Sequence, residues 1–283
     1  MIETITALIT RILSNPTANV VQKRLSDSYS AVLINLYSYA FLSLACIWFA
    51  CQNNWLQYSW NYWGYVCLAG MLCTLGSVCL IKALKYGELS VLGPINSYKC
   101  VVGLIIAYFM LGEIPDIAGA WGVIMIIGGS WFIFDTVKEG FSFKLLLRKD
   151  IILRFCALFF TGCEAVVLKK IILLSSVGEC FILWCFSGFI FSLLLMIFMR
   201  KDFCAVSKKD VGSIFVIALC LGLMQYSTNI VFKHIDVGLS LALFQLSNII
   251  TVFAGYYIFT EGNPVKKIIG TVIMIVGSCL ILI

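Results

Sequence analysis

Long apolar runs separated by short polar gaps dominate the pattern of this chain. A bilayer core about 30 Å thick requires roughly 20 helical residues, because a helix rises about 1.5 Å per residue. The runs of this length are 3–22, 29–50, 63–84, 90–111, 116–134, 151–173, 178–199, 211–232, 239–259 and 264–283. The pattern therefore predicts ten transmembrane helices. It excludes a transmembrane β-barrel, whose strands alternate over about ten residues.

Composition narrows the class of protein further. Apolar residues make up 61% of the 283 positions and charged residues 12%, against about 45–50% and about 25% in soluble domains. These values exclude a soluble enzyme, a disordered chain and a nucleic-acid-binding protein. We expect an all-α, multi-pass protein of the cell (inner) membrane that contacts membrane lipids and no nucleic acid.

The two halves of the chain are similar to each other. The matching segments, in order, are Val20–Arg24 with Val166–Lys170, Lys85–Ser90 with Lys233–Ser240, Phe109–Glu113 with Tyr257–Glu261, and Val123–Gly128 with Val272–Gly277, at separations of 146 to 150 positions. Because five helices per half is an odd number, the second copy must cross the membrane in the opposite sense. Inverted repeats of this kind place a binding site near the membrane midplane. We predict five-helix repeats over 1–134 and 151–283, a connecting loop over 135–150, and a monomer or homodimer.

Several local features accompany the repeat. Asn19–Lys23 close the first run, Pro94 lies in the fourth, Gly112 and Glu113 precede the fifth, and the fifth and tenth runs end in glycine-rich segments. With the two five-helix halves, these features resemble the EamA-type branch of the drug/metabolite transporter superfamily over nearly the whole chain. The resemblance implies a secondary transporter with a central cavity lined by runs one to four and six to nine. Runs five and ten would be peripheral, and no particular substrate is implied.

Polar side chains inside a bilayer are costly and require a reason. In the first run Arg11, Asn15, Asn19 and Gln22 share one helical face, because their spacing follows the helical repeat. Of these, Arg11, Asn15 and Asn19 are candidates for substrate binding, together with Tyr39, Asn96, Lys99, Gln225, Tyr226, Asn229, Gln245 and Asn248. The fifth and tenth runs contain no Asn, Gln or charge in their interiors. We expect the polar runs to line a cavity, although Asn and Gln side chains also hold membrane helices together.

Three charged side chains fall near the middle of predicted spans. Arg11 and Lys99 either form structural salt bridges or bind substrate, and Glu164 either pairs with one of them or carries a coupling proton. Their sum of +1 favours a small-molecule substrate with an anionic group. Glu113 and Glu261 precede the fifth and tenth runs, where a carboxylate caps a helix N-terminus.

The leading functional interpretation is a secondary transporter of a small polar metabolite that works by alternating access. A flippase-like carrier of a lipid-linked or cell-surface precursor is the alternative. A membrane-embedded transferase is disfavoured, because the sequence has no DxxD pair, HExxH, GxSxG or Gly-rich phosphate loop. No ATP-binding motif is present, so transport is expected to be gradient-driven or facilitative. Scattered cysteines and a single histidine predict no metal and no cofactor.

The distribution of basic residues between the two sides predicts how the chain is oriented in the membrane. Fifteen of the twenty Lys and Arg residues flank the side opposite the N-terminus, and three flank the side that carries it. The positive-inside rule then places both termini outside, whereas the family resemblance implies both inside.

Overall fold

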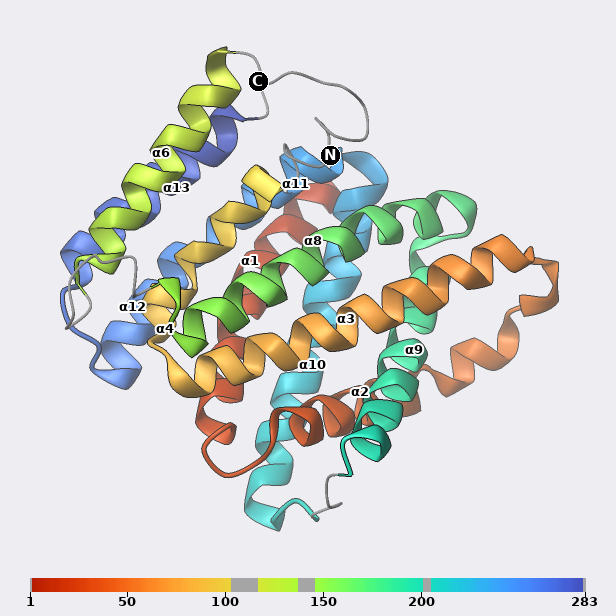
Figure 1. Ribbon diagram of the computed structural model, residues 1–283. Helices are drawn as coiled ribbons and strands as arrows, with labels where there is room; N and C mark the ends of the chain where they lie inside the picture. Colours follow the sequence, from red (N-terminus) through yellow and green to blue (C-terminus); the bar gives the residue numbers. More distant parts are fainter. Residues whose placement is uncertain (1, 103–116, 137–145, 201–204, 282–283) are drawn as a thin grey trace.

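The computed structural model describes residues 2–102, 117–136, 146–200 and 205–281, and its regular elements are helical. They are α1 (Ile2–Leu25), α2 (Ala31–Gln52), η1 (Trp55–Gln57), α3 (Trp60–Tyr86), α4 (Leu89–Leu92), η2 (Pro94–Ser97), α6 (Ile117–Phe134), α8 (Lys149–Leu174), α9 (Val177–Phe198), α10 (Lys208–His234), α11 (Val237–Phe244), α12 (Ser247–Phe259) and α13 (Pro264–Leu280). Figure 1 shows them as one helical bundle, with α6 and α13 at one edge.

Within the described residues, seven stretches are long and apolar enough to cross a membrane. They are α2, α3, α6, α8, α9, α10 and the pair α11–α12 taken together. Polar residues lower the apolar character of α1, and α13 has only 17 residues. The bounds of the long helices lie close to the predicted runs. An all-helical, multi-pass membrane protein is therefore confirmed.

Two of the predicted helices are interrupted. α4 ends at Leu92, and Pro94 opens the 3₁₀ segment η2 because proline lacks the N–H that a continuing helix needs. In the second repeat the corresponding run is broken between α11 and α12, at Gln245 and Leu246. The predicted span over 239–259 is confirmed as one apolar stretch, Val237–Phe259, but its helix is interrupted. The part of the run 90–111 beyond residue 102 lies outside the described residues.

Helices α2 and α9, which are equivalent in the two repeats, run in opposite directions. Asn35 Nδ2 donates to Ser192 Oγ at 2.8 Å, and eight residues further along α2 the Ser43 hydroxyl donates to the carbonyl oxygen of Cys185 at 3.0 Å. Residue numbers rise along one helix as they fall along the other. This antiparallel packing of equivalent helices is what an inverted repeat requires.

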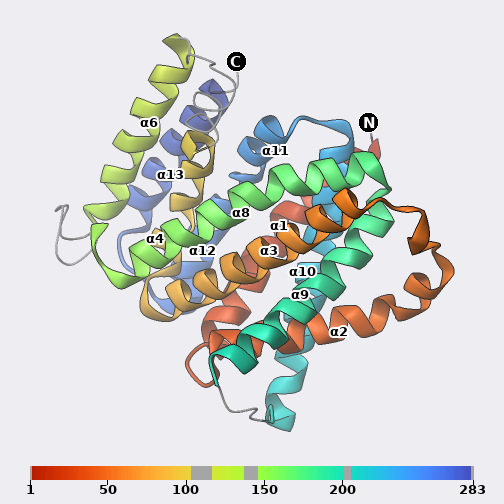
Figure 2. The same cartoon turned by 45° about the vertical axis from the view of Figure 1, so that its right-hand side comes forward.

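Helices α6 and α13 form the second equivalent pair and are also antiparallel. Gly122 packs on Gly277, and Gly129 packs on Gly270. The backbones touch at both points: a Cβ atom added to Gly270 would lie 2.5 Å from the carbonyl oxygen of Gly129. Small residues allow this close approach of membrane helices. Figures 1 and 2 show the pair standing beside the bundle.

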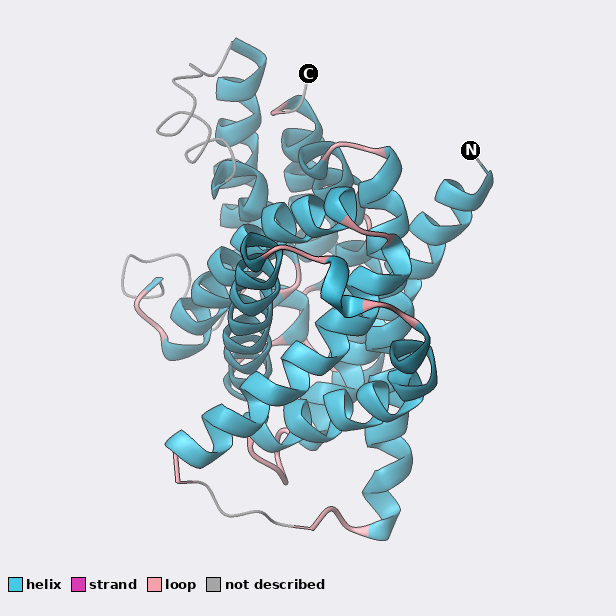
Figure 3. Ribbon diagram, turned by 90° about the vertical axis from the view of Figure 1, so that its right-hand side faces the viewer, coloured by secondary structure: helices cyan, strands magenta, loops and turns pink. Residues whose placement is uncertain are grey.

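Two further helix pairs correspond to each other under the same pseudo-twofold symmetry. α1 packs along α10, and α3 packs along α8. Exchanging the two repeats converts the first pair into the second. α1 begins and α13 ends toward the same end of the molecule, as an even number of crossings requires (Figure 3).

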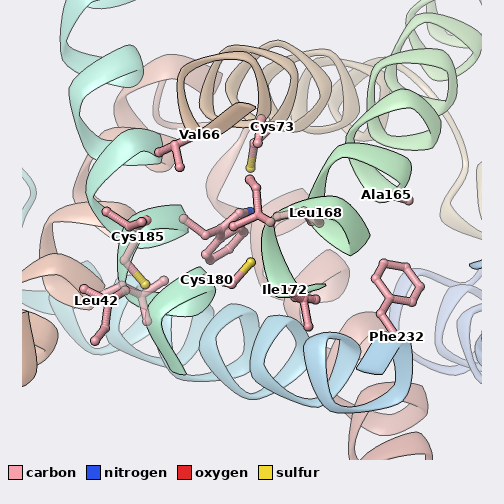
Figure 4. Close-up of a cluster of buried hydrophobic side chains, with 14 of the residues drawn as sticks. Leu42, Val66, Cys73, Ala165, Leu168, Ile172, Cys180, Cys185 and Phe232 are labelled. Atoms are coloured by element: carbon pink, nitrogen blue, oxygen red, sulfur yellow. The ribbon is translucent and has the colours of Figure 1, made fainter. Parts of the chain in front are cut away.

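A buried apolar cluster joins α2, α3, α8, α9 and α10 (Figure 4). Cys180 and Cys185 lie inside it, where a free cysteine acts as a small apolar side chain. Cys73, Leu168 and Phe232 belong to this cluster and also form part of the wall of a polar cavity. The cluster therefore supports the cavity from behind.

Candidate substrate-binding cavity

A cavity of about 120 Å³ lies between the two repeats. Its walls come from α1, α2, α3, η2 and the residues after it, α8, α9, α10 and α11, and none of its lining residues belongs to α6 or α13. The lining helices thus correspond to the predicted runs one to four and six to nine. α6 and α13 are peripheral.

Eight of the twelve predicted site residues line this cavity. They are Arg11, Asn15, Asn19, Tyr39, Asn96, Lys99, Glu164 and Gln225. Gln22 continues the polar face of α1 along the same wall, and its Oε1 atom is buried without a donor among the described residues. The helical spacing along α1 therefore predicted which side of the helix faces the cavity.

Four predicted residues lie elsewhere. Asn229 accepts a hydrogen bond from Gln225 Nε2 at 2.9 Å behind the lining. Gln245 and Asn248 are buried at the break between α11 and α12. Tyr226 is 45% exposed and packs against Phe181 with the ring centroids 5.5 Å apart. A direct role of these residues in substrate binding stays a prediction.

The two helix breaks meet at the pseudo-twofold axis. Gln245 Oε1 accepts hydrogen bonds from Asn96 Nδ2 at 3.2 Å and from Asn248 Nδ2 at 2.9 Å. Gln245 Nε2 donates to the carbonyl oxygen of Leu241 at 2.8 Å. Asn96 and Gln245 are 149 residues apart, which matches the repeat separation, so their contact joins corresponding positions of the two repeats. The amide network holds both interrupted helices in register.

Arg154 is the cavity residue that sequence reasoning missed. We expected it in a polar flank, because it lies only one turn inside the sixth run. It is buried instead, and its Nε donates to the carbonyl oxygen of Leu92 at 2.8 Å. Leu92 ends α4, so Arg154 satisfies a backbone acceptor next to the interruption. No local signal in the sequence indicates this contact.

Arg11 is also buried, with 8% of its surface exposed. Its Cζ atom lies 4.2 Å from the centre of the Phe244 ring, at the end of α11. Cation–π contact of this kind stabilises the charge over the ring face. Nε and Nη1 are both buried and have no acceptor among the described residues.

Glu164 is held on a different wall. Its Oε1 accepts a hydrogen bond from Trp184 Nε1 at 2.9 Å, and Cys73 lies at hydrogen-bonding range as well. Tyr39 hydroxyl and Cys73 Sγ are 2.8 Å apart, which extends the chain of polar contacts. The four ion pairs among the described residues do not include Glu164. The predicted pairing of Glu164 with Arg11 or Lys99 is therefore not formed in this structure.

A charged network closes one end of the bundle beyond the cavity. Lys23 Nζ lies 2.8 Å from Glu261 Oε1 and also donates to the carbonyl oxygen of Gly87 at 2.8 Å. Lys267, only 1% exposed, donates to Glu88 at 2.6 Å and to Ser90 Oγ at 2.7 Å. We call these five residues and Ser90 the Lys23–Glu261 network.

The position of Glu261 differs from the predicted cap of the final helix. Its carboxylate accepts from the backbone N–H groups of Leu89 at 2.7 Å and Ser90 at 2.8 Å, and from the Ser90 hydroxyl. It therefore caps α4 of the first repeat, and the prediction that it caps the final helix was wrong. Burial alone would raise the pKa of Glu261, but hydrogen bonds from Lys23 and Ser90 outweigh burial and hold that pKa below its ordinary value. Glu113 lies outside the described residues.

Comparison with known proteins agrees with this architecture. The profile of the EamA-like transporter family matches residues 5–135 and again residues 148–283. A search of functionally curated proteins finds no match. One similar solved structure, described only as "Crystal structure of protein", is 14% identical, with a TM-score of 0.67 over 99% of this chain and 94% of its own. At this identity the likeness shows the fold alone.

Two inverted helical repeats around a polar cavity define a membrane transport protein. The chain belongs to the EamA-like transporter family, within the drug/metabolite transporter superfamily. It is therefore a transporter and not an enzyme.

Proposed function

We propose that this chain is a secondary transporter, gradient-driven or facilitative, that moves a small polar metabolite by alternating access. The observation that carries the proposal is the polar cavity at the junction of the repeats, where both interrupted helices meet. Irregular backbone at membrane depth is tolerated where it is buried in protein or lines a cavity. Broken helices at the interface of inverted repeats are typical of substrate sites in carriers.

The two ends of the bundle supply a means of alternation. Lys23 bonds the carbonyl oxygen of Gly87 at one end, and Lys169 bonds the carbonyl oxygen of Ile235 at the other. Gly87 and Ile235 follow equivalent helices, α3 and α10, so the two contacts correspond under the pseudo-symmetry. We propose that the Lys23–Glu261 network breaks when its end opens. Rocking of the repeats then exposes the central cavity to each side in turn.

Location and substrate charge complete the proposal. Basic residues concentrate at the end that carries the Lys23–Glu261 network, which supports a cytoplasmic position for that end and outside termini. Apolar side chains such as Trp121 and Ile124 cover the outer face of α6, as contact with lipid of the cell (inner) membrane requires. Arg11, Lys99 and Arg154 outnumber Glu164 in the cavity, which supports a substrate with an anionic group.

A lipid-linked substrate is the second candidate, and one observation favours it. An almost wholly apolar hollow of about 520 Å³ lies between α3 and α9, lined by residues that include Met71, Leu75, Phe191 and Phe198. Thr74 lines the same hollow. An acyl or isoprenoid chain fits such a surface, while the polar head of the same molecule would enter the cavity.

Counterflow in proteoliposomes tests the proposed function. Purified protein is reconstituted into liposomes loaded with one unlabelled compound from a panel of small acids, neutral polyols and amines, and uptake of the same radiolabelled compound is measured. A secondary transporter gives transient, saturable accumulation of at least one compound. The absence of counterflow throughout the panel contradicts the proposal, and movement of a short-chain lipid phosphate alone supports the flippase-like candidate.

A further inference from the structure

We infer that Arg11 is the residue that binds the acidic group of the substrate, a carboxylate or phosphate on a small molecule, whereas Arg154 serves the helix break. This inference deepens the proposed function and rests on it. It follows from a difference between two arginines that hold similar places in the two repeats.

The two arginines come from equivalent helices. Arg11 belongs to α1, which opens the first repeat, and Arg154 belongs to α8, which opens the second. Each reaches across to the interrupted helix of the other repeat: Arg154 to Leu92 at the end of α4, and Arg11 to Phe244 at the end of α11. Both therefore lie beside a helix break in the cavity wall.

Their hydrogen bonding differs. Arg154 Nε has a backbone acceptor 2.8 Å away. Arg11 has only the face of the Phe244 ring, and two of its buried nitrogen atoms have no acceptor among the described residues. A buried cation with unused N–H groups is expensive unless something pairs with it. Arg11 stays buried with unsatisfied N–H groups despite the unfavourable free energy. This is expected if the substrate itself supplies the missing acceptor.

The surroundings of Arg11 select a negative ligand. Lys99 and Arg154 line the same cavity as Arg11, so three basic side chains share this space. Glu164 is engaged by Trp184 and makes no ion pair within the described part of the chain. Because Phe244 covers one face of the guanidinium, the free N–H groups at its edge remain for an acceptor in its plane. Charge-assisted bonds from guanidinium to carboxylate or phosphate are among the strongest polar contacts.

The size of the cavity limits the molecule. A cavity of about 150 Å³ in another protein accommodates benzene, and the cavity described above has about 120 Å³. An acidic group with a few further heavy atoms fits this space. Glycerate and inorganic phosphate are therefore suitable probes for the two acidic groups, with glycerol as the neutral analogue and ethanolamine as the cationic one.

The experiment combines ligand binding with protein stability. Wild type, Arg11→Met and Arg24→Met are purified in detergent, and thermal unfolding is followed with increasing concentrations of each probe. Arg24 is the matched control, because it lies on the same helix, is exposed and does not line the cavity. We expect glycerate or phosphate, but neither glycerol nor ethanolamine, to raise Tm of wild type and Arg24→Met. Arg11→Met should weaken that effect at least about tenfold in apparent Kd.

The ligand-free proteins separate binding from a structural role. Removing an unpaired buried cation should leave Tm of Arg11→Met equal to or above that of wild type, whereas loss of a structural arginine lowers it. A lowered Tm overturns the inference, as does a wild type stabilised by none of the acids or equally by glycerol. A preference for glycerate over phosphate assigns a carboxylate, and the reverse preference assigns a phosphate. Counterflow of neutral or cationic compounds that is indifferent to Arg11→Met leaves the transporter proposal intact and removes this inference.

Discussion

Lys23 Nζ and Glu261 Oε1 lie 2.8 Å apart although 238 residues separate them in the chain. The contact joins the end of the first helix in one repeat to the loop before the last helix of the other. Since Glu261 also caps α4, a single carboxylate ties together three elements at one end of the bundle. A carrier that opens at this end must release the contact.

Replacement Glu261→Gln should therefore destabilise the closed end. The amide can still accept a hydrogen bond but no longer neutralises Lys23, and a largely buried cation that loses its counter-charge costs about 3 kcal/mol. The expected result is a clear drop in Tm in detergent at neutral pH. Lys266→Ala is the matched control, because its ion pair with Asp135 is exposed and is worth less than about 1 kcal/mol. Equal losses in the two variants would contradict the assignment.

The same carboxylate predicts a dependence on pH. The pKa of Glu261 is lowered in the folded protein, so its contribution to stability is present above the ordinary value of 4.5 and disappears as pH falls through the folded value. The difference in Tm between wild type and Glu261→Gln should therefore be largest at neutral pH and shrink on acidification below about 4.5. Thermal unfolding measured from pH 7 to pH 3 checks this. A difference that grows toward low pH would refute it.

Close packing of α6 on α13 gives a third prediction. In Gly270→Ala the new methyl group meets the carbonyl oxygen of Gly129 at 2.5 Å, so the two helices must separate. Overpacking of this kind costs about 1–3 kcal/mol. Gly128→Ala, on the partner helix α6, is the control, because a Cβ atom there has nothing within 4 Å and alanine favours the helix. Tm should fall for the first variant and hold or rise for the second.

The amide contact between Asn96 and Gln245 at the pseudo-twofold axis gives a fourth prediction. Gln245→Leu removes the acceptor of both Asn96 and Asn248, and each buried donor left unsatisfied costs about 1–3 kcal/mol. Asn96→Leu combined with Gln245→Leu should cost less than the sum of the single changes, because the double variant leaves fewer orphaned groups. Unfolding free energies of the four proteins form the test. Strict additivity would show that the two breaks are not coupled through this contact.

Glu164 allows a test of proton coupling. If it carries the coupling proton, Glu164→Gln keeps counterflow, which needs no gradient, but loses uptake driven by a pH difference across the liposome. Trp184→Phe removes the hydrogen bond to Glu164 and keeps the titratable group, so driven uptake should persist with an altered pH profile. Driven uptake that survives Glu164→Gln would exclude the coupling role.

Much of the architecture could be predicted from the sequence, because both the apolar runs and the helical spacing of polar residues are local signals. Spacing along α1 placed Arg11, Asn15 and Asn19 on one face. One break has a local cause in Gly93 and Pro94. The other, at Gln245, contains neither glycine nor proline, and it depends on side-chain contacts across the symmetry axis.

The residues whose place in the cavity could not be predicted depend on contacts between helices that are distant in the sequence. Gln225 lines the cavity while Tyr226 faces outward, because adjacent helical residues differ by about 100° in direction. Only packing of α10 on its neighbours decides which of them faces inward. Likewise, the sequence places Arg154 at the flank of a span. Its burial depends on the carbonyl oxygen of Leu92, which is distant in the chain and accepts its hydrogen bond.

The central claim is that the cavity between the repeats opens to both sides of the membrane in turn. It is tested most directly by labelling Asn15→Cys, in a chain whose native cysteines have been replaced, with a membrane-impermeant thiol reagent applied to either face of oriented vesicles. The account predicts labelling from both faces, with faster labelling from the face carrying Lys23 when Glu261→Gln is added. Labelling confined to one face in both proteins would contradict it.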